Sequence, residues 1–173
     1  MEQPGAQPRT LLELFDARLG LTPDAPALVQ LRGGRVQVST WKEWERRSRW
    51  IAAGLMALNV EAQDRVAILC RTRPEWAVID LGVLKAGATS VPIFSTELSK
   101  TVGDLLADAQ VGVIFVEDAA QAQKVSEHLS SGETQVVRVI QVEGVVDQGL
   151  GDHCISLEQL VEMGERSLGS SRV

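Results

Sequence analysis

The chain has 173 residues, of which 45% are hydrophobic and 23% are charged, which is the composition of an ordinary globular protein. A chain of this length can bury roughly two thirds of its unfolded surface. The net charge of -6 and the pI of about 5.0 argue against a general nucleic-acid-binding surface. No apolar run reaches the roughly eighteen residues of a membrane-spanning helix, and no basic segment precedes an apolar stretch as in a secretory signal.

The N-terminal part predicts a helix and a hairpin. Residues 1–10 are rich in Pro, Gly and Gln and are expected to form a flexible arm. Leucines and a phenylalanine then recur at helical spacing over residues 11–19, and Gly20 is expected to end that helix. Residues 27–31 and 35–40 read as two strands joined through the glycines of residues 32–34.

A capping box marks the next helix. In the segment Thr40-Trp41-Lys42-Glu43, the threonine hydroxyl can accept from the third helical N–H while the glutamate reaches back to the threonine N–H. Apolar residues at steps of three and four continue to Leu58, which indicates a helix with one buried face.

Strands and helices alternate after Asn59. The strands are expected at residues 65–70, 89–94, 111–117 and 135–142, and the helices at residues 74–86, 100–110 and 118–129. Gly87 is expected to end the first of these helices in a positive-φ conformation. Pro92 has no N–H to donate, so its strand is expected to lie at a sheet edge, to be irregular, or to leave the sheet there.

The C-terminal part predicts a loop, a helix and a tail. Residues 143–153 are loop-like, Ser156 and Gln159 cap a last short helix, and residues 169–173 read as an unstructured tail. The predicted fold is an α/β domain over residues 11–168, with a mostly parallel layered sheet and helices on both faces, preceded by a short helix and a β-hairpin.

A more specific signal lies between Arg71 and Thr96. Its two blocks, Arg71-Thr72-Arg73-Pro74-Glu75-Trp76 and Leu84-Lys85-Ala86-Gly87-Ala88-Thr89-Ser90-Val91-Pro92-Ile93-Phe94-Ser95-Thr96, resemble the early conserved stretch of the adenylate-forming (AMP-binding) superfamily. Thr22-Pro23-Asp24-Ala25-Pro26 resembles the opening of that family, and the combination of Pro-Glu-Trp with Val-Pro-Ile-Phe-Ser-Thr is most similar to the long-chain fatty-acid–CoA ligases. The resemblance covers about residues 10–145 and implies the N-terminal subdomain of the acyl-CoA synthetase fold.

The resemblance implies an ATP-dependent ligase that adenylates a carboxylate and passes it to CoA, with ATP, Mg and CoA required by the full-length family. The Ser/Thr/Gly-rich phosphate-binding loop ending in Pro-Lys-Gly, which that family places later, has no counterpart in this sequence. The later Tyr/Gly-Glu segment, the ribose-binding aspartate and the C-terminal lysine are also absent. The chain alone is therefore expected to be inactive and to need no cofactor.

Individual residues carry only weak signals of chemistry. Arg71 and Arg73 follow a predicted strand, where α/β proteins often bind ligands, so an anion site is one interpretation; an ordinary structural role is favoured. Cys70 ends a buried strand without a nearby His, and His153-Cys154 lacks the spacing of a zinc site. No catalytic, cofactor-binding or metal-binding residue is assigned.

Three interpretations remain open. The first is a segment of a long-chain fatty-acid–CoA ligase, which would expose an apolar face to its missing remainder or to a second copy. The second is a non-catalytic interaction module derived from such a synthetase. The third, an unrelated flavodoxin-like or receiver-like domain, lacks the acidic pair or the phosphate loop that those folds require. Two distant cysteines without a C-x-x-C motif favour a cytoplasmic location.

Overall fold

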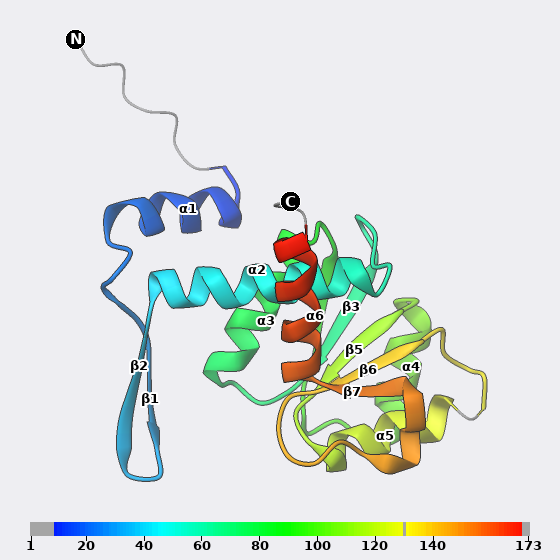
Figure 1. The fold of residues 1–173 in the computed structure, drawn as a ribbon. Helices are drawn as coiled ribbons and strands as arrows, with labels where there is room; N and C mark the ends of the chain where they lie inside the picture. The colour runs from blue at the N-terminus through cyan, green and yellow to red at the C-terminus, as the bar shows by residue number, and fades with distance from the viewer. Residues whose placement is uncertain (1–8, 130, 171–173) are drawn as a thin grey trace. The chain divides into compact units, whose positions relative to one another are not determined.

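A computed structural model describes residues 9–129 and 131–170 (Figure 1). The chain divides into two compact units between Arg46 and Arg47, and this boundary falls inside a helix. Residues 1–8 of the expected flexible arm and residues 171–173 of the expected tail lie outside the described residues. Arg9 and Thr10 are described, and Thr10 is the N-cap of the first helix.

The first unit contains a helix, a hairpin and the start of a second helix. Its elements are α1 (Leu11–Leu21), β1 (Pro26–Arg32), β2 (Arg35–Thr40) and the first residues of α2 (Trp41–Ala57). Thr10 and Glu13 form a capping box at α1, and the capping box predicted for Thr40 and Glu43 is present at α2. The sequence pattern T-x-x-E would have located the first one as well.

The hairpin is the antiparallel pair that the sequence predicts. Arg32 faces Arg35, so only Gly33 and Gly34 form the turn, with φ values of 57° and 75°. Two-residue turns of this kind need positive φ at both positions, which glycine adopts without strain. Next to the hairpin, Phe15 of α1 packs edge-on against Trp41 and Trp44, with ring centroids 5.6 and 5.2 Å away.

The second unit is built on a five-stranded sheet in which all neighbours are parallel. Its strand order is β4 (Thr89–Ile93), β3 (Arg65–Leu69), β5 (Val113–Val116), β6 (Arg138–Gln141) and β7 (Cys154–Ser156). The parallel α/β arrangement is confirmed. Pro92 lies in β4 at the edge of this sheet, which is one of the three expected positions.

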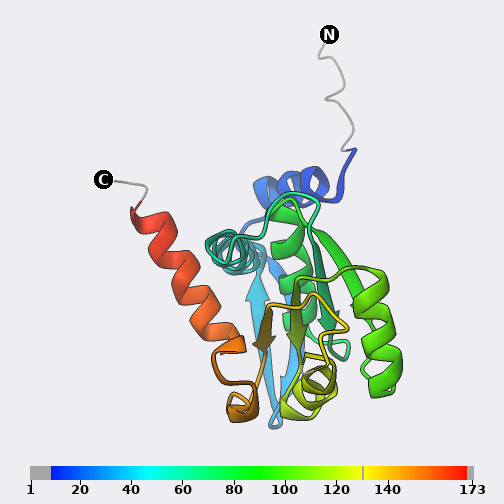
Figure 2. The same ribbon diagram turned by 90° about the vertical axis from the view of Figure 1, so that its right-hand side faces the viewer.

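Helices cover both faces of the sheet, as predicted (Figure 2). One face packs against α4 (Ser99–Asp108) and α5 (Ala119–Leu129), and the other against α3 (Pro74–Lys85), α6 (Leu157–Ser170) and the second unit's part of α2. Strand residues such as Ala67 and Leu69 alternate with Val66 and Ile68, and all four are fully buried. A strand buried on both faces is expected of a parallel sheet.

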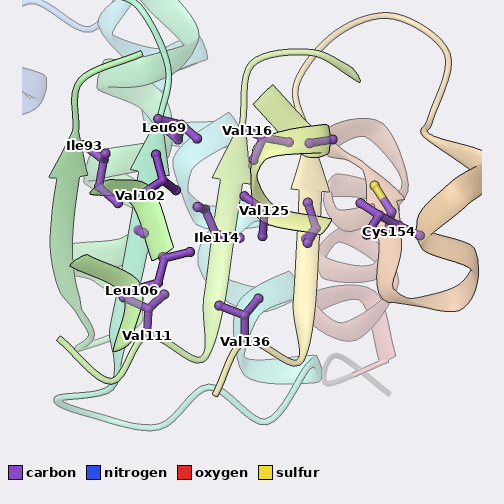
Figure 3. Packing of buried hydrophobic residues seen from close by; sticks show 14 residues of the cluster. Leu69, Ile93, Val102, Leu106, Val111, Ile114, Val116, Val125, Val136 and Cys154 are labelled. Atoms are coloured by element: carbon purple, nitrogen blue, oxygen red, sulfur yellow. The ribbon is translucent and has the colours of Figure 1, made fainter. Parts of the chain in front are cut away.

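The core on the α4–α5 side consists mainly of aliphatic side chains that meet between the strands and these two helices (Figure 3). It contains Ala67, Leu69, Ile93, Val102, Leu106, Val111, Ile114, Val116, Ala122, Val125, Val136, Val139, Leu150 and Cys154. β-Branched and leucine side chains dominate because they have few rotamers and no polar atoms to satisfy.

The segment before α6 differs from its predicted loop. It contains a short 3-10 helix over Gln148–His153 and the edge strand β7, which the sequence analysis did not predict. Three residues are too few to produce a readable alternation, so β7 is defined by its pairing with β6. The Ser156–Gln159 cap is confirmed, but α6 runs through Ser170, so Gly169 and Ser170 are helical and not part of a tail.

The helix α6 crosses α2 at a backbone contact. A Cβ atom added to Gly164 would lie 1.8 Å from the carbonyl oxygen of Trp50, and one added to Gly54 would lie 2.4 Å from that of Leu160. Real Cβ atoms do not approach backbone this closely, so only glycine allows these helices to lie at this separation. Arg47 and Glu158 add a 3.2 Å ion pair between the same two helices.

We expect Gly164→Ala to destabilise the protein by about 1–3 kcal/mol, because the added methyl group would force the two helix backbones apart. The matched control is Gly169→Ala in the same helix, where a Cβ meets nothing within 4 Å. That variant should be neutral or more stable by up to about 1 kcal/mol. Urea unfolding followed by circular dichroism measures both; equal midpoints for the two variants would contradict the close crossing.

Candidate functional site

Charged side chains collect where three neighbouring strands end. Arg71 and Arg73 follow β3, Glu117 follows β5, and Glu143 follows β6. The carboxyl ends of parallel strands share one edge of the sheet, which is where open α/β sheets usually bind ligands. We call Arg71, Arg73, Glu75, Glu117 and Glu143 the edge cluster and consider it first as a candidate site.

Glu117 is the centre of the edge cluster. Its side chain is only 3% exposed, and it accepts from the backbone N–H of Arg71 at 3.0 Å. The guanidinium of Arg71 donates to the same carboxylate through Nε at 2.9 Å and through Nη2 at 2.6 Å. These hydrogen bonds from Arg71 lower the pKa of Glu117 below its ordinary value, although burial alone would raise it.

Arg73 connects the remaining members. Its Nε donates to Glu75 at 2.8 Å and its Nη2 donates to Glu143 at 2.8 Å, while Nη1 lies 3.4 Å from Glu117. The side chain is 16% exposed, and its hydrogen bonds, first of all the one to Glu75, raise its pKa. Arg73 therefore joins the start of α3 to the ends of β5 and β6.

The charge balance of the edge cluster opposes anion binding. Three carboxylates, those of Glu75, Glu117 and Glu143, face two guanidinium groups, so the cluster carries an excess of negative charge. Both arginines donate to carboxylates within the chain, although the Arg71 side chain is 70% exposed. These contacts favour a structural role for Arg71 and Arg73 over the anion site.

Sequence reasoning placed the two arginines correctly but missed their partner. Glu117 ends an otherwise apolar strand, and an acidic residue at that position was the available signal. Its pairing could not be read from the sequence because Arg71 lies 46 residues away.

The cysteines and histidines do not form a reactive group. Burial raises the pKa of Cys70 to about 12 and also raises the pKa of Cys154, so neither thiol ionises readily near neutrality. Both cysteines are free. His153 lies 3.4 Å from the carbonyl oxygen of Val137, and His128 contacts Ser99 on α4.

Over residues 9–129 and 131–170, no three His, Cys, Asp or Glu side chains are grouped so that they could hold a metal ion. Within the same residues, no helix is both long enough and apolar enough to cross a membrane.

We expect Glu117→Gln to cost about 1–3 kcal/mol at pH 7, because it removes the charge of a buried carboxylate that accepts hydrogen bonds from Arg71. Since the folded pKa of Glu117 lies below its ordinary value of 4.5, its contribution is present above about pH 4.5. It is lost as the pH falls through the folded pKa, so the difference between wild type and variant should shrink in acid.

Urea titrations at pH 7 and at several acidic values test this expectation. Glu158→Gln is the control, because Glu158 is 65% exposed in a surface ion pair. Its unfolding free energy should change by less than about 1 kcal/mol. A Glu117→Gln variant with the same stability and pH dependence as wild type would contradict a structural role for the edge cluster.

Cys70 and Cys154 should resist alkylation by iodoacetamide at pH 8 in the folded protein, since each is only 6% exposed and has a raised pKa. Both should react rapidly in about 8 M urea, which unfolds most domains of this size. Mass spectrometry of the labelled chain measures the difference. Rapid modification of the folded protein would show an accessible thiolate.

Comparison with known proteins identifies what this scaffold resembles. Residues 15–159 match the family described as AMP-binding enzyme. The long-chain-fatty-acid–CoA ligase FadD15 of Mycobacterium bovis is 38% identical over 105 residues, which cover 61% of this chain and 17% of that protein. The long-chain-fatty-acid–CoA ligase heimdall of Drosophila melanogaster is 31% identical over 121 residues, which cover 68% of this chain and 18% of that protein.

A shorter relative is also found. The uncharacterized protein Rv1549 of Mycobacterium tuberculosis is 32% identical over 111 residues, which cover 64% of this chain and 62% of that protein. The present chain thus spans about a sixth of the ligases that it matches, but well over half of Rv1549. Because the family match extends over most of the sequence, the chain belongs to the AMP-binding enzyme family.

Proposed function

We propose that this chain is the N-terminal part of an ATP-dependent long-chain fatty-acid–CoA ligase. The complete enzyme would adenylate a fatty acid and then transfer the acyl group to CoA, using ATP, Mg and CoA. This chain alone is inactive and supplies scaffold to that reaction. No catalytic, cofactor-binding or metal-binding role is assigned to its own residues.

The supporting observation is the match to two long-chain-fatty-acid–CoA ligases of which the chain spans only 17–18%. The motifs that identify the family by resemblance, such as the stretch around Pro92, form an edge strand and a helix end. The ligand-binding edge of the sheet carries carboxylates in excess, which would repel the phosphates of ATP. The residues present therefore do not fit a nucleotide site.

The exposed apolar residues support association with other protein. Seven of the thirteen large hydrophobic residues that are exposed in the described chain belong to residues 9–46. Four of them, Val29, Leu31, Val36 and Val38, are paired with one another across the hairpin and therefore share one face. We propose that this face is covered by the remainder of the ligase or by a second copy, in the cytoplasm.

The alternative is a non-catalytic interaction module derived from such a ligase. Rv1549 favours this alternative. The 111 matched residues make up 62% of Rv1549, so that protein has little room for the rest of a ligase. A module of this kind would bind an intact partner enzyme, whereas a ligase segment would bind only a ligase that lacks the corresponding part.

We expect the purified chain to form no acyl-CoA from palmitate, ATP, Mg and CoA, because the phosphate-binding loop is absent from its sequence. Joining the chain to the remainder of M. bovis FadD15 in one polypeptide should produce acyl-CoA. Chromatography of the thioester measures both reactions, and intact FadD15 is the positive control. Turnover by the chain alone would contradict the proposed inactivity, and an inactive but folded chimera would contradict the proposed role.

A further inference from the structure

The loop between β4 and α4 presents two large apolar side chains to solvent. Phe94 is 79% exposed and Leu98 is 75% exposed. Neither belongs to the core cluster, although Ile93 immediately before Phe94 is only 4% exposed. We call residues 94–98 the anchor loop. Two such side chains four residues apart on one loop offer an apolar contact surface to another molecule.

The backbone of the anchor loop is held by α5. Lys124 donates to the carbonyl oxygens of Ser95 and Glu97 at 2.9 and 2.7 Å, and Gln121 donates to that of Ser95 at 3.2 Å. A lysine at a surface normally keeps its ammonium in water. Here Lys124 binds two carbonyl groups of one loop, which fixes the direction of the chain between them.

Further contacts close both ends of the loop. The N–H of Glu97 donates to the carbonyl of Phe94 at 3.1 Å, and the N–H of Val102 donates to that of Leu98 at 3.0 Å. Beyond the loop, Nε2 of His128 lies 2.8 Å from the carbonyl oxygen of Ser99. The two exposed side chains therefore belong to a loop whose backbone carbonyl groups already accept hydrogen bonds from within the chain.

A loop that is held in this way loses little conformational entropy when a partner covers it. Ordering a free loop and its side chains on binding costs about 0.5–1.5 kcal/mol per immobilised side chain, in addition to the backbone cost. Aromatic residues, Phe among them, are enriched at protein–protein interfaces relative to the rest of the surface. The anchor loop has this construction without contributing to the core.

The surroundings of the loop indicate the chemistry of the partner. Ile93 pairs with Leu69, so the anchor loop leaves the same sheet edge as Arg71 and lies beside the negatively charged edge cluster. Strand addition at β4 is disfavoured, because Pro92 lacks an N–H in this edge strand. Recognition there must use side chains, and it favours an apolar pocket bordered by Lys or Arg.

We propose that Phe94 and Leu98 form a preorganised docking anchor for the remaining part of the ligase, at a pocket with basic residues at its rim. This inference rests on the proposed function, which supplies the identity of the partner. A second copy is disfavoured at this surface, because a symmetric contact would bring two edge clusters of excess negative charge together. Residues 47–173 contain seventeen acidic and eleven basic residues, so the net negative charge of the whole unit also opposes contact with a second copy.

The test uses the full chain and, as the probe, the part of M. bovis FadD15 that follows its matched segment, purified with an affinity tag. Phe94→Ser combined with Leu98→Ser should weaken binding at least tenfold in calorimetry. The matched control combines Met56→Ser with Val137→Ser, which are 51% and 62% exposed at other places in the chain. The control should bind within twofold of wild type.

Substitution of Lys124 tests whether binding depends on the fixed backbone of the loop or only on its apolar side chains. Lys124→Met keeps the aliphatic stem but removes both hydrogen bonds to the loop carbonyls, and it should weaken binding about three- to tenfold with Phe94 and Leu98 intact. Lys124→Arg can restore the donors and should recover most of the affinity. Circular dichroism melting checks that each variant is folded. Wild-type affinity in Lys124→Met would overturn the claim of preorganisation.

The outcomes distinguish the inference from the proposed function. Equal weakening by the loop variant and the control, or no binding by wild type, overturns the anchor. Self-association that disappears in the loop variant would assign the surface to a second copy and also overturn it. The function is judged separately by acyl-CoA formation in the joined chimera: an active chimera with unchanged activity and melting temperature in the loop variant would retain the function and reject the anchor.

Discussion

The α/β unit depends on one constraint: a parallel sheet must be covered on both faces, because its crossover helices return over those faces. On one side, α4 and α5 meet the strands through ordinary aliphatic packing. On the other, α6 reaches its place only because Gly164 lets its backbone approach that of Trp50. The close crossing places Leu157 and Leu160 of α6 in the core, where both are almost fully buried. The short edge strand β7 is then held between its pairing with β6 and the helix that follows it.

The same architecture explains why charged side chains collect at one edge of the sheet. The carboxyl ends of β3, β5 and β6 gather charged groups as α/β folds usually do. In this chain the two arginines pair with carboxylates around Glu117, and the network joins the strand ends. Function lies in sites that a fold carries, and a fold segment can be recognised without one.

The two units differ in their charge and in the apolar side chains that they expose. Residues 1–46 contain six basic and six acidic residues, whereas the excess negative charge lies entirely in residues 47–173. The first unit exposes a neutral, aliphatic hairpin face, and the second exposes Phe94 and Leu98 beside carboxylates. These surfaces differ in chemistry, so they are suited to different contacts. The anchor loop is the more specific of the two because its backbone is fixed by Lys124 before any partner arrives.

The sequence by itself determined the elements whose signals are local: the hairpin with its Gly33-Gly34 turn, the capping boxes, the alternating strands and helices, and the edge position that Pro92 permits. It also located Arg71 and Arg73 at a strand end. Only the tertiary structure decided that Glu117 accepts hydrogen bonds from Arg71. The contact of two helix backbones at Gly164 and the strand that begins at Cys154 were likewise visible only in the folded chain. The physical reason is range. Capping and periodicity act between residues a few positions apart, whereas ion pairs, close helix crossings and strand pairing join residues that only the folded chain brings together.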